Sequence, residues 1–251
     1  MAVEYSAGMI GTPLTPPPLV YAHRGDRTRA ADNTLEAYRL AVEAGSDGIE
    51  LDVRRTSDGA LILSHDDRYP GMSPFIELTM AEVRDQAPDV PTLVQMLSAV
   101  PSHIWLNVEI KNDPRDPDFD PTRSIVDQTI ETIAEYDSLA RILLSSFDPE
   151  SMQRASDHYP ELLRGQLLTT PLDLGYGIEI AVAQKGRAVH PAMSYFRADA
   201  APGMQMIHDA GLAAVVWGAN TPDDVATLLG VGVDVIITDD PAMARRLVDQ
   251  R

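Results

Sequence analysis

Residues 48–66 read GIELDVRRTSDGALILSHD, and this stretch decides how the rest of the chain is interpreted. Its first part is apolar and β-branched, as expected of a buried strand, yet Glu50 and Asp52 lie inside it. Alternate residues of a strand share a face, so the two carboxylates point the same way while the apolar residues between them point the other way. The sequence therefore predicts a buried strand that presents two acids on one face.

The second part of the stretch predicts the return of a hairpin. The residues Ser57-Asp58-Gly59 are typical of a tight turn, and LILSHD (61–66) would be the returning arm. Folding the chain near Asp58 would bring His65 level with Glu50. This geometry would gather two carboxylates and one imidazole into a single patch.

Outward from this stretch, strand-like runs alternate with helical patterns along the chain. With the returning arm set aside, the strand-like runs number eight: 19–25, 48–53, 104–111, 141–147, 164–170, 188–194, 213–220 and 233–240. Helical patterns separate most of them, at 33–45, 79–86, 92–100, 124–136, 149–159, 202–211, 222–232 and 241–250. This alternation predicts an α/β fold, a TIM-type (β/α)8 barrel with a β-hairpin extension after the second strand.

The organisation is expected to be simple. Residues 1–17 end in TPLTPPP and are predicted to be a proline-rich tail, because clustered prolines favour extended backbone. Residues 18–251 are predicted to form one catalytic barrel domain, which fits a chain of 251 residues. The acidic segment 112–120, NDPRDPDFD, is interpreted as a solvated loop rather than a second cation site.

Composition limits the classes of function. The net charge of −18 repels phosphate backbones, so nucleic acid is not expected as a partner. The absence of cysteine excludes disulfides, thiol catalysis and thiolate metal sites. No basic leader and no run of about 18 apolar residues are visible, so we expect a cytoplasmic protein with no stable membrane insertion. The sequence leaves the oligomeric state open.

Further chemically active residues lie at the ends of the first and third barrel strands. His23 and Arg24 end the first strand, and Glu109 and Lys111 end the third on a common face. Active sites of this fold lie at the carboxyl ends of the strands. Three carboxylates without thiolates suit Ca²⁺ or Mg²⁺, two cationic side chains suit a phosphate, and paired histidines suit proton transfer. Together these residue types predict metal-dependent cleavage of a phosphodiester.

At these residues the sequence resembles the glycerophosphodiester phosphodiesterase family, relatives of the phosphatidylinositol phospholipase C barrels. The similarity extends from Leu19 to about Ala242, and each motif alone is weak whereas all of them in order are specific. The matching motifs are His-Arg-Gly at 23–25, Glu-Leu-Asp-Val at 50–53, Thr-x-Asp-Gly at 56–59, His-Asp at 65–66, Glu-Ile-Lys at 109–111, Ser-Ser-Phe-Asp at 145–148 and Thr-Asp-x-Pro at 238–241.

The resemblance implies a role for each matching residue. It implies a single divalent cation, Ca²⁺ or Mg²⁺, held by Glu50, Asp52 and Glu109. It also implies hydrolysis of a small glycerophosphodiester to glycerol 3-phosphate and an alcohol. The remaining implied roles are His23 and His65 as the acid/base pair, Arg24 and Lys111 as phosphate ligands, and Trp217 as the wall beside the glycerol carbons.

The chain also departs from the family pattern. The usual Pro-Glu-Asn-Thr is Ala31-Asp32-Asn33-Thr34 here, and the usual Trp-Thr-Val-Asn is 217–220, Trp-Gly-Ala-Asn. The segment after His65 is short, which leaves room for a bulkier head group. The related sphingomyelinase D-like enzymes have a shorter interval between the two histidines and usually have disulfides, whereas His23 and His65 are 42 residues apart here.

Other interpretations of the same residues stay open. Cleavage of a lysophospholipid-type diester would need apolar side chains at the pocket mouth, for which Tyr69, Phe75 and Ile76 are the candidates. A non-catalytic barrel that binds a phosphoester is a further alternative. Arg24 could pair with Asp66, Trp217 could be plain core packing, and His190 is expected to be a satisfied structural histidine rather than a pocket residue.

Overall fold

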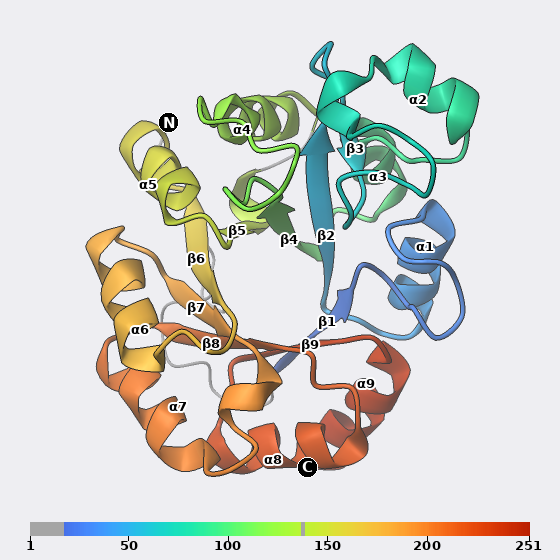
Figure 1. Ribbon diagram of the computed structural model, residues 1–251. Helices are drawn as coiled ribbons and strands as arrows, with labels where there is room; N and C mark the ends of the chain where they lie inside the picture. The colour runs from blue at the N-terminus through green and yellow to red at the C-terminus, as the bar shows by residue number, and fades with distance from the viewer. Residues whose placement is uncertain (1–17, 137–138) are drawn as a thin grey trace.

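The protein, described by a computed structural model over residues 18–136 and 139–251, has a closed ring of eight parallel strands (Figure 1). The predicted tail, residues 1–17, lies outside the described residues. The sheet order is β1-β9-β8-β7-β6-β5-β4-β2, and β1 pairs with β2 to close the ring. The strands are β1 (Leu19–His23), β2 (Gly48–Arg55), β4 (Trp105–Ile110), β5 (Ile142–Ser146), β6 (Leu163–Leu168), β7 (Ala188–Pro191), β8 (Ala213–Trp217) and β9 (Val235–Thr238).

Helices surround this ring in Figure 1. Many begin at a Thr or Asp whose side chain accepts a hydrogen bond from the first turn, such as Thr34, Asp148 and Thr221. The helices are α1 (Leu35–Glu43), α2 (Met80–Gln86), α3 (Leu93–Ala99), α4 (Ser124–Tyr136), α5 (Pro149–His158), α6 (Leu174–Ala183), α7 (Ala200–Asp209), α8 (Pro222–Val231) and α9 (Pro241–Asp249). Short 3-10 turns occupy Phe75–Glu77, Leu139–Arg141 and Met193–Tyr195.

The predicted barrel and its extra hairpin are confirmed. Strand β3 (Leu61–Leu63) lies outside the ring and pairs antiparallel with β2, with Val53 opposite Leu63. The predicted register is wrong by one residue, because the amide of Ser64 donates to the carbonyl of Asp52 at 3.2 Å. His65 therefore leaves the hairpin one step nearer to Asp52 than expected.

One helix was not predicted. Helix α6 is apolar on nearly every face, with Glu179 as its single charged residue, and it includes Gly175 and Gly177. A helix without a polar face gives no 3.6-residue pattern in the sequence. Its two glycines also weaken the propensity signal.

Apolar side chains fill the barrel on both sides of the strands. Tyr21, Leu143 and Val215 belong to the cluster inside the ring, and two larger clusters lie between the ring and the helices. A fourth, smaller cluster forms around Ile62 and Phe75 beneath the segment that follows the hairpin. The polar residues of interest project from the carboxyl ends of the strands, above this packing.

Within the part of the chain that the structure describes, no helix combines the length and apolarity needed to cross a bilayer.

Candidate active site

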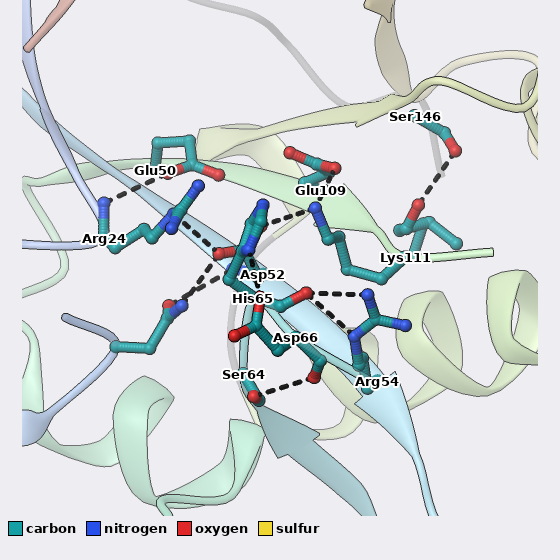
Figure 2. Close-up of polar contacts among 12 residues, drawn as sticks. Arg24, Glu50, Asp52, Arg54, Ser64, His65, Asp66, Glu109, Lys111 and Ser146 are labelled. Carbon is teal, nitrogen blue, oxygen red and sulfur yellow. Dashed lines mark hydrogen bonds and ion pairs between the residues drawn. The ribbon is translucent and has the colours of Figure 1, made fainter. Parts of the chain in front are cut away.

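Three carboxylates meet above the barrel on two neighbouring strands (Figure 2). Glu50 and Asp52 come from β2, and Glu109 comes from β4, where it is the register partner of Asp52. One oxygen from each lies within 4.8 Å of the others, and all three residues are buried. The alternation along β2 and the parallel β2–β4 pairing bring them together, as the sequence predicted.

Two cationic side chains lie against this trio. Lys111 Nζ lies 2.8 Å from Glu109 Oε1 and 3.3 Å from Asp52 Oδ1. Arg24 Nε lies 3.0 Å from Asp52 Oδ2, and the Arg24 backbone amide donates to Glu50 Oε2 at 3.0 Å. Arg24 does pair with acidic neighbours, as the alternative interpretation allowed, but its guanidinium contacts Asp52 and, at 3.2 Å, Asp32 instead of Asp66.

The environment pushes the pKa values of the two β2 carboxyls apart. Burial, with the charges of Asp52 and Glu109, raises the pKa of Glu50 well above its ordinary value. Burial acts the same way on Asp52, but Lys111 and Arg24 outweigh it and hold the pKa of Asp52 well below its usual range. The site therefore accommodates the ionised Asp52 already, whereas among the described residues Glu50 forms no ion pair with a lysine or an arginine.

The donor set fits a hard divalent cation. Glu50 Oε1 is buried without a hydrogen-bond partner among the described residues. A buried carboxylate oxygen in that state is costly unless a cation or a proton satisfies it. The trio and its two basic neighbours total one excess negative charge, and oxygen-only ligands are those that Ca²⁺ and Mg²⁺ take.

His23 is held in place by an acid from the last strand of the barrel. Its Nδ1 lies 2.6 Å from Asp239 Oδ1, and its Nε2 lies 4.0 Å from Glu50 Oε2. Asp239 is fixed in turn by Arg27 at 2.8 Å and by Asn220 at 2.9 Å. Because Asp239 occupies Nδ1, the ring directs Nε2 toward the carboxylates.

His65 is fixed mainly through its backbone. The Nε and Nη2 of Arg54 donate to the His65 carbonyl at 3.0 and 2.6 Å (Figure 2). Its Nδ1 lies 2.8 Å from Asp66 Oδ1. Burial and the nearby Lys111 hold the pKa of the His65 imidazole below its ordinary value, although the charge of Asp52 opposes them. A histidine with a lowered pKa is neutral at pH 7 and can accept a proton.

The segment 112–120 is not the solvated loop that was predicted. Asp118 and Asp120 are both buried. Arg54 donates to both carboxylate oxygens of Asp118 at 2.6 Å, and Arg55 lies 3.0 Å from Asp120. This acidic run therefore neutralises two arginines of β2 and anchors the β4–α4 connection beside the site.

A pocket of about 150 Å³ joins these groups above the barrel. Seven of the eight predicted site residues line it, namely His23, Arg24, Glu50, His65, Glu109, Lys111 and Trp217. The eighth, Asp52, is fully buried beneath Arg24 and Lys111. Trp217 packs against the interior apolar cluster and also lines the pocket, where its ring lies edge-on to Phe147 with centroids 6.1 Å apart.

His190 differs from its expected role. It is fully buried, and neither ring nitrogen has a hydrogen-bond partner among the described residues. Burial alone lowers the pKa of this imidazole to about 3. Its backbone carbonyl accepts a hydrogen bond from Trp217 Nε1, in the pocket wall, at 3.0 Å.

Several contributors had no role in the sequence interpretation. Asp239 lies in the Thr-Asp-x-Pro motif, and closure of the ring makes β9 the neighbour of β1. The motif and the ring closure together were the signal that could have placed Asp239 beside His23. Phe147 follows β5 directly, at the strand end where pocket residues are expected. Asn33 Nδ2 donates to Asp52 Oδ2 at 2.8 Å, and the residue has a φ of 52°. Its signal was its place as the retained Asn of the motif at 31–34.

Fold and site together define a barrel enzyme that acts on phosphate esters. Comparison with known families agrees: residues 23–243 match the model of the glycerophosphoryl diester phosphodiesterase family. The chain belongs to this family. It is thus a phosphoric diester hydrolase.

Individual relatives cover nearly the whole chain. A glycerophosphodiester phosphodiesterase of Caldanaerobacter subterraneus subsp. tengcongensis is 29% identical over 246 residues, covering 92% of this chain and 97% of the relative. A putative glycerophosphoryl diester phosphodiesterase structure from Silicibacter pomeroyi has a TM-score of 0.80 at 22% identity, covering 93% of each chain. An Oleispira antarctica phosphodiesterase, solved with the product sn-glycerol-3-phosphate, has a TM-score of 0.79 at 22% identity, covering 92% and 97%.

Proposed function

We propose that this protein hydrolyses glycerophosphodiesters to glycerol 3-phosphate and an alcohol, with one divalent cation, Ca²⁺ or Mg²⁺, at the three carboxylates. The single observation that carries the proposal is the buried trio with its unpartnered Glu50 oxygen, in the same pocket as His23 and His65. Glu50, Asp52 and Glu109 would hold the cation. When bound, the cation supplies a Lewis acid that stabilises negative charge on phosphoryl oxygens.

The residues of this chain divide the remaining work. Arg24 and Lys111 neutralise two of the three carboxylates, so a divalent cation would leave the site with one net positive charge. That charge complements the single negative charge of a phosphodiester. Trp217 forms an apolar wall against which the glycerol carbons pack.

Proton transfer falls to the two histidines that line the pocket. One imidazole, neutral at its free nitrogen, accepts the proton of the attacking hydroxyl, which comes from water or from the glycerol itself. The other imidazole, protonated, donates to the leaving alkoxide. Asp239 and Asp66 hold the Nδ1 positions and leave the Nε2 positions for these transfers.

The test is an assay of glycerophosphocholine hydrolysis in which the release of glycerol 3-phosphate is measured. Activity is expected to disappear with a chelator and to return with Ca²⁺ or Mg²⁺. The variants His23→Ala and His65→Ala are each expected to lose at least about a hundredfold in kcat. His103→Ala, at an exposed histidine away from the pocket, is the matched control.

Full activity of both pocket variants would refute the proposal as a whole. A chelator-resistant activity that still depends on the histidines would refute only the metal. The two parts of the proposal are thus tested separately.

A further inference from the structure

A second, mostly apolar depression adjoins the catalytic pocket. It has a volume of about 430 Å³ and extends over the carboxyl ends of β5 and β6 to α6. Two residues, Phe147 and Leu167, line both this groove and the catalytic pocket. The other apolar residues of its wall are Pro149, Pro171, Leu172 and Ile180. We call this depression the α6 groove.

The wall of the α6 groove is unusually apolar for exposed surface. Leu172, in the groove lining, is 38% exposed, and Tyr176, outside the lining but one helical turn before Ile180, is 54% exposed. These two residues are among the few large apolar side chains that the described surface exposes. In a chain with net charge −18, an apolar strip beside a charged site indicates an apolar ligand.

The apolar residues that the sequence suggested for binding a lysophospholipid at the pocket mouth do not line the α6 groove. Phe75 is fully buried in the small cluster with Ile62 and Val83. Tyr69 packs edge-on against Phe75 with ring centroids 5.5 Å apart. These side chains stabilise the segment after the hairpin, so the α6 groove is the surface with apolar walls that continues from the pocket.

The type of ligand follows from the continuity of the α6 groove with the catalytic pocket. A ligand that fills the α6 groove passes Phe147 and Leu167 and then reaches the site that would hold the phosphate. Its apolar part is therefore joined to the diester. Phe147, which lines both the groove and the pocket, packs against Trp217, the residue beside which the glycerol would lie. The acyl chain therefore belongs on the glycerol.

We infer that the substrates of this enzyme include lysophospholipid-type diesters, whose single acyl chain lies in the α6 groove. The inference rests on the proposed function and names its substrate class. Water adds its hydroxyl group to phosphorus, the bond between phosphorus and the alcohol oxygen breaks, and the alcohol takes up the proton. The products are an acylglycerol phosphate and the free alcohol.

The first test is a chain-length series with the full-length wild-type enzyme. The substrates are glycerophosphocholine and its 1-butanoyl, 1-hexanoyl and 1-octanoyl esters, each below its critical micelle concentration, with choline release as the readout. Each buried CH₂ group can raise kcat/KM by up to about fourfold. We expect octanoyl to exceed butanoyl by at least about tenfold.

Two variants test whether the dependence of kcat/KM on chain length arises in the α6 groove. Leu172→Asp places a charge at the far end of the α6 groove and is expected to reduce the octanoyl-to-butanoyl ratio of kcat/KM at least about fivefold. Val182→Asp places the same charge on helix α6 itself, at a residue that is 50% exposed and outside the groove lining. Its ratio is expected to stay within about twofold of wild type.

The outcomes separate the two proposals. Hydrolysis of glycerophosphocholine without any dependence on chain length would overturn the acyl groove and leave the proposed function intact. Absence of hydrolysis for every diester would overturn the proposed function. A groove filled by a second copy of the chain would appear as a dimer in analytical ultracentrifugation without chain-length dependence, and this too would overturn the inference.

Discussion

At the residue scale, Arg54 joins three segments with one guanidinium. It lies on β2, two residues beyond Asp52 and on the same face, and is 3% exposed. It donates to the carbonyl of His65 and to Asp116 and Asp118 of the β4–α4 connection. The planar fork of an arginine allows all these contacts at once, and a lysine ammonium cannot reproduce them.

We expect Arg54→Lys to lower kcat on glycerophosphocholine at least about tenfold, with KM changed by less than about threefold. The positive charge that neutralises Asp118 remains, but lysine cannot reproduce the two hydrogen bonds that Arg54 donates to the His65 carbonyl. A small displacement of a group involved in proton transfer reduces kcat strongly. Steady-state kinetics measure the split between kcat and KM.

The matched control is Arg55→Lys. Arg55 is the next residue of β2 and donates to Asp120 of the same connection and to Ser124, the first residue of α4, with no hydrogen bond to His65 among the described residues. The Arg55→Lys variant is expected to keep kcat within about twofold of wild type and to lose about as much thermal stability as Arg54→Lys. Equal losses of kcat in both variants would show that Arg54 only anchors the connection.

The residues predicted for the site converge because two simple rules determine their positions. Alternation along a strand places Glu50 and Asp52 on one face, and parallel pairing sets Glu109 beside Asp52. The supporting residues, such as Arg54 and Asp239, depend on contacts across 64 and 216 residues of sequence. Local patterns contain no information on such long-range partners.

At the element scale, the turn after β1 shapes the site through its backbone. Arg24 and Gly25 have φ values of 56° and 89°, both in the left-handed region. This turn directs the Arg24 amide to Glu50 Oε2 and packs Gly25 against α1. A Cβ atom on Gly25 would lie 2.6 Å from the Cβ of Ala37, so the His-Arg-Gly motif needs glycine for space as well as for φ.

Gly25→Ala is therefore expected to lower the free energy of unfolding by at least about 3 kcal/mol. Gly71→Ala is the control, because Gly71 also has a positive φ, of 86°, but a methyl group on it would have no atom within 4 Å. That control is expected to lose only about 1 kcal/mol, from backbone strain. Urea unfolding measures both values, and equal losses would contradict the steric explanation.

The elements that the sequence predicted have either strong alternation or clear capping residues. Helix α5 begins with Asp148 and Pro149, and α8 begins with Thr221 and Pro222, and both were predicted. Helix α6 also has a capping residue, Asp173, but no polar face to give a period. The missing polar face is explained if part of its surface borders the apolar α6 groove.

At the scale of the whole molecule, ring closure decides what lies in the interior. Eight parallel strands enclose a cluster that includes Tyr21, Leu143 and Val215, and His190 is buried on β7 with its side chain against Gly165. The sequence predicted the eight strands, but not which polar side chains closure would leave without partners. Such side chains depend on the filling of the interior by all strands together.

The buried His190 makes the stability of the whole barrel depend on pH. The pKa of this imidazole is about 3 in the folded protein and about 6.5 when unfolded, so between these values the unfolded chain binds the extra proton. Stability is therefore lost as the pH falls below about 6.5. The contribution of this one group amounts to about 1.5 kcal/mol between pH 6.5 and pH 5.

His190→Leu is expected to remove that part of the pH dependence, measured by urea unfolding at pH 7, 6 and 5 at constant chelator concentration. His103→Leu, at an exposed histidine, is expected to keep the wild-type slope. Equal slopes for wild type and His190→Leu would show that the imidazole is protonated as readily in the barrel as in the unfolded chain.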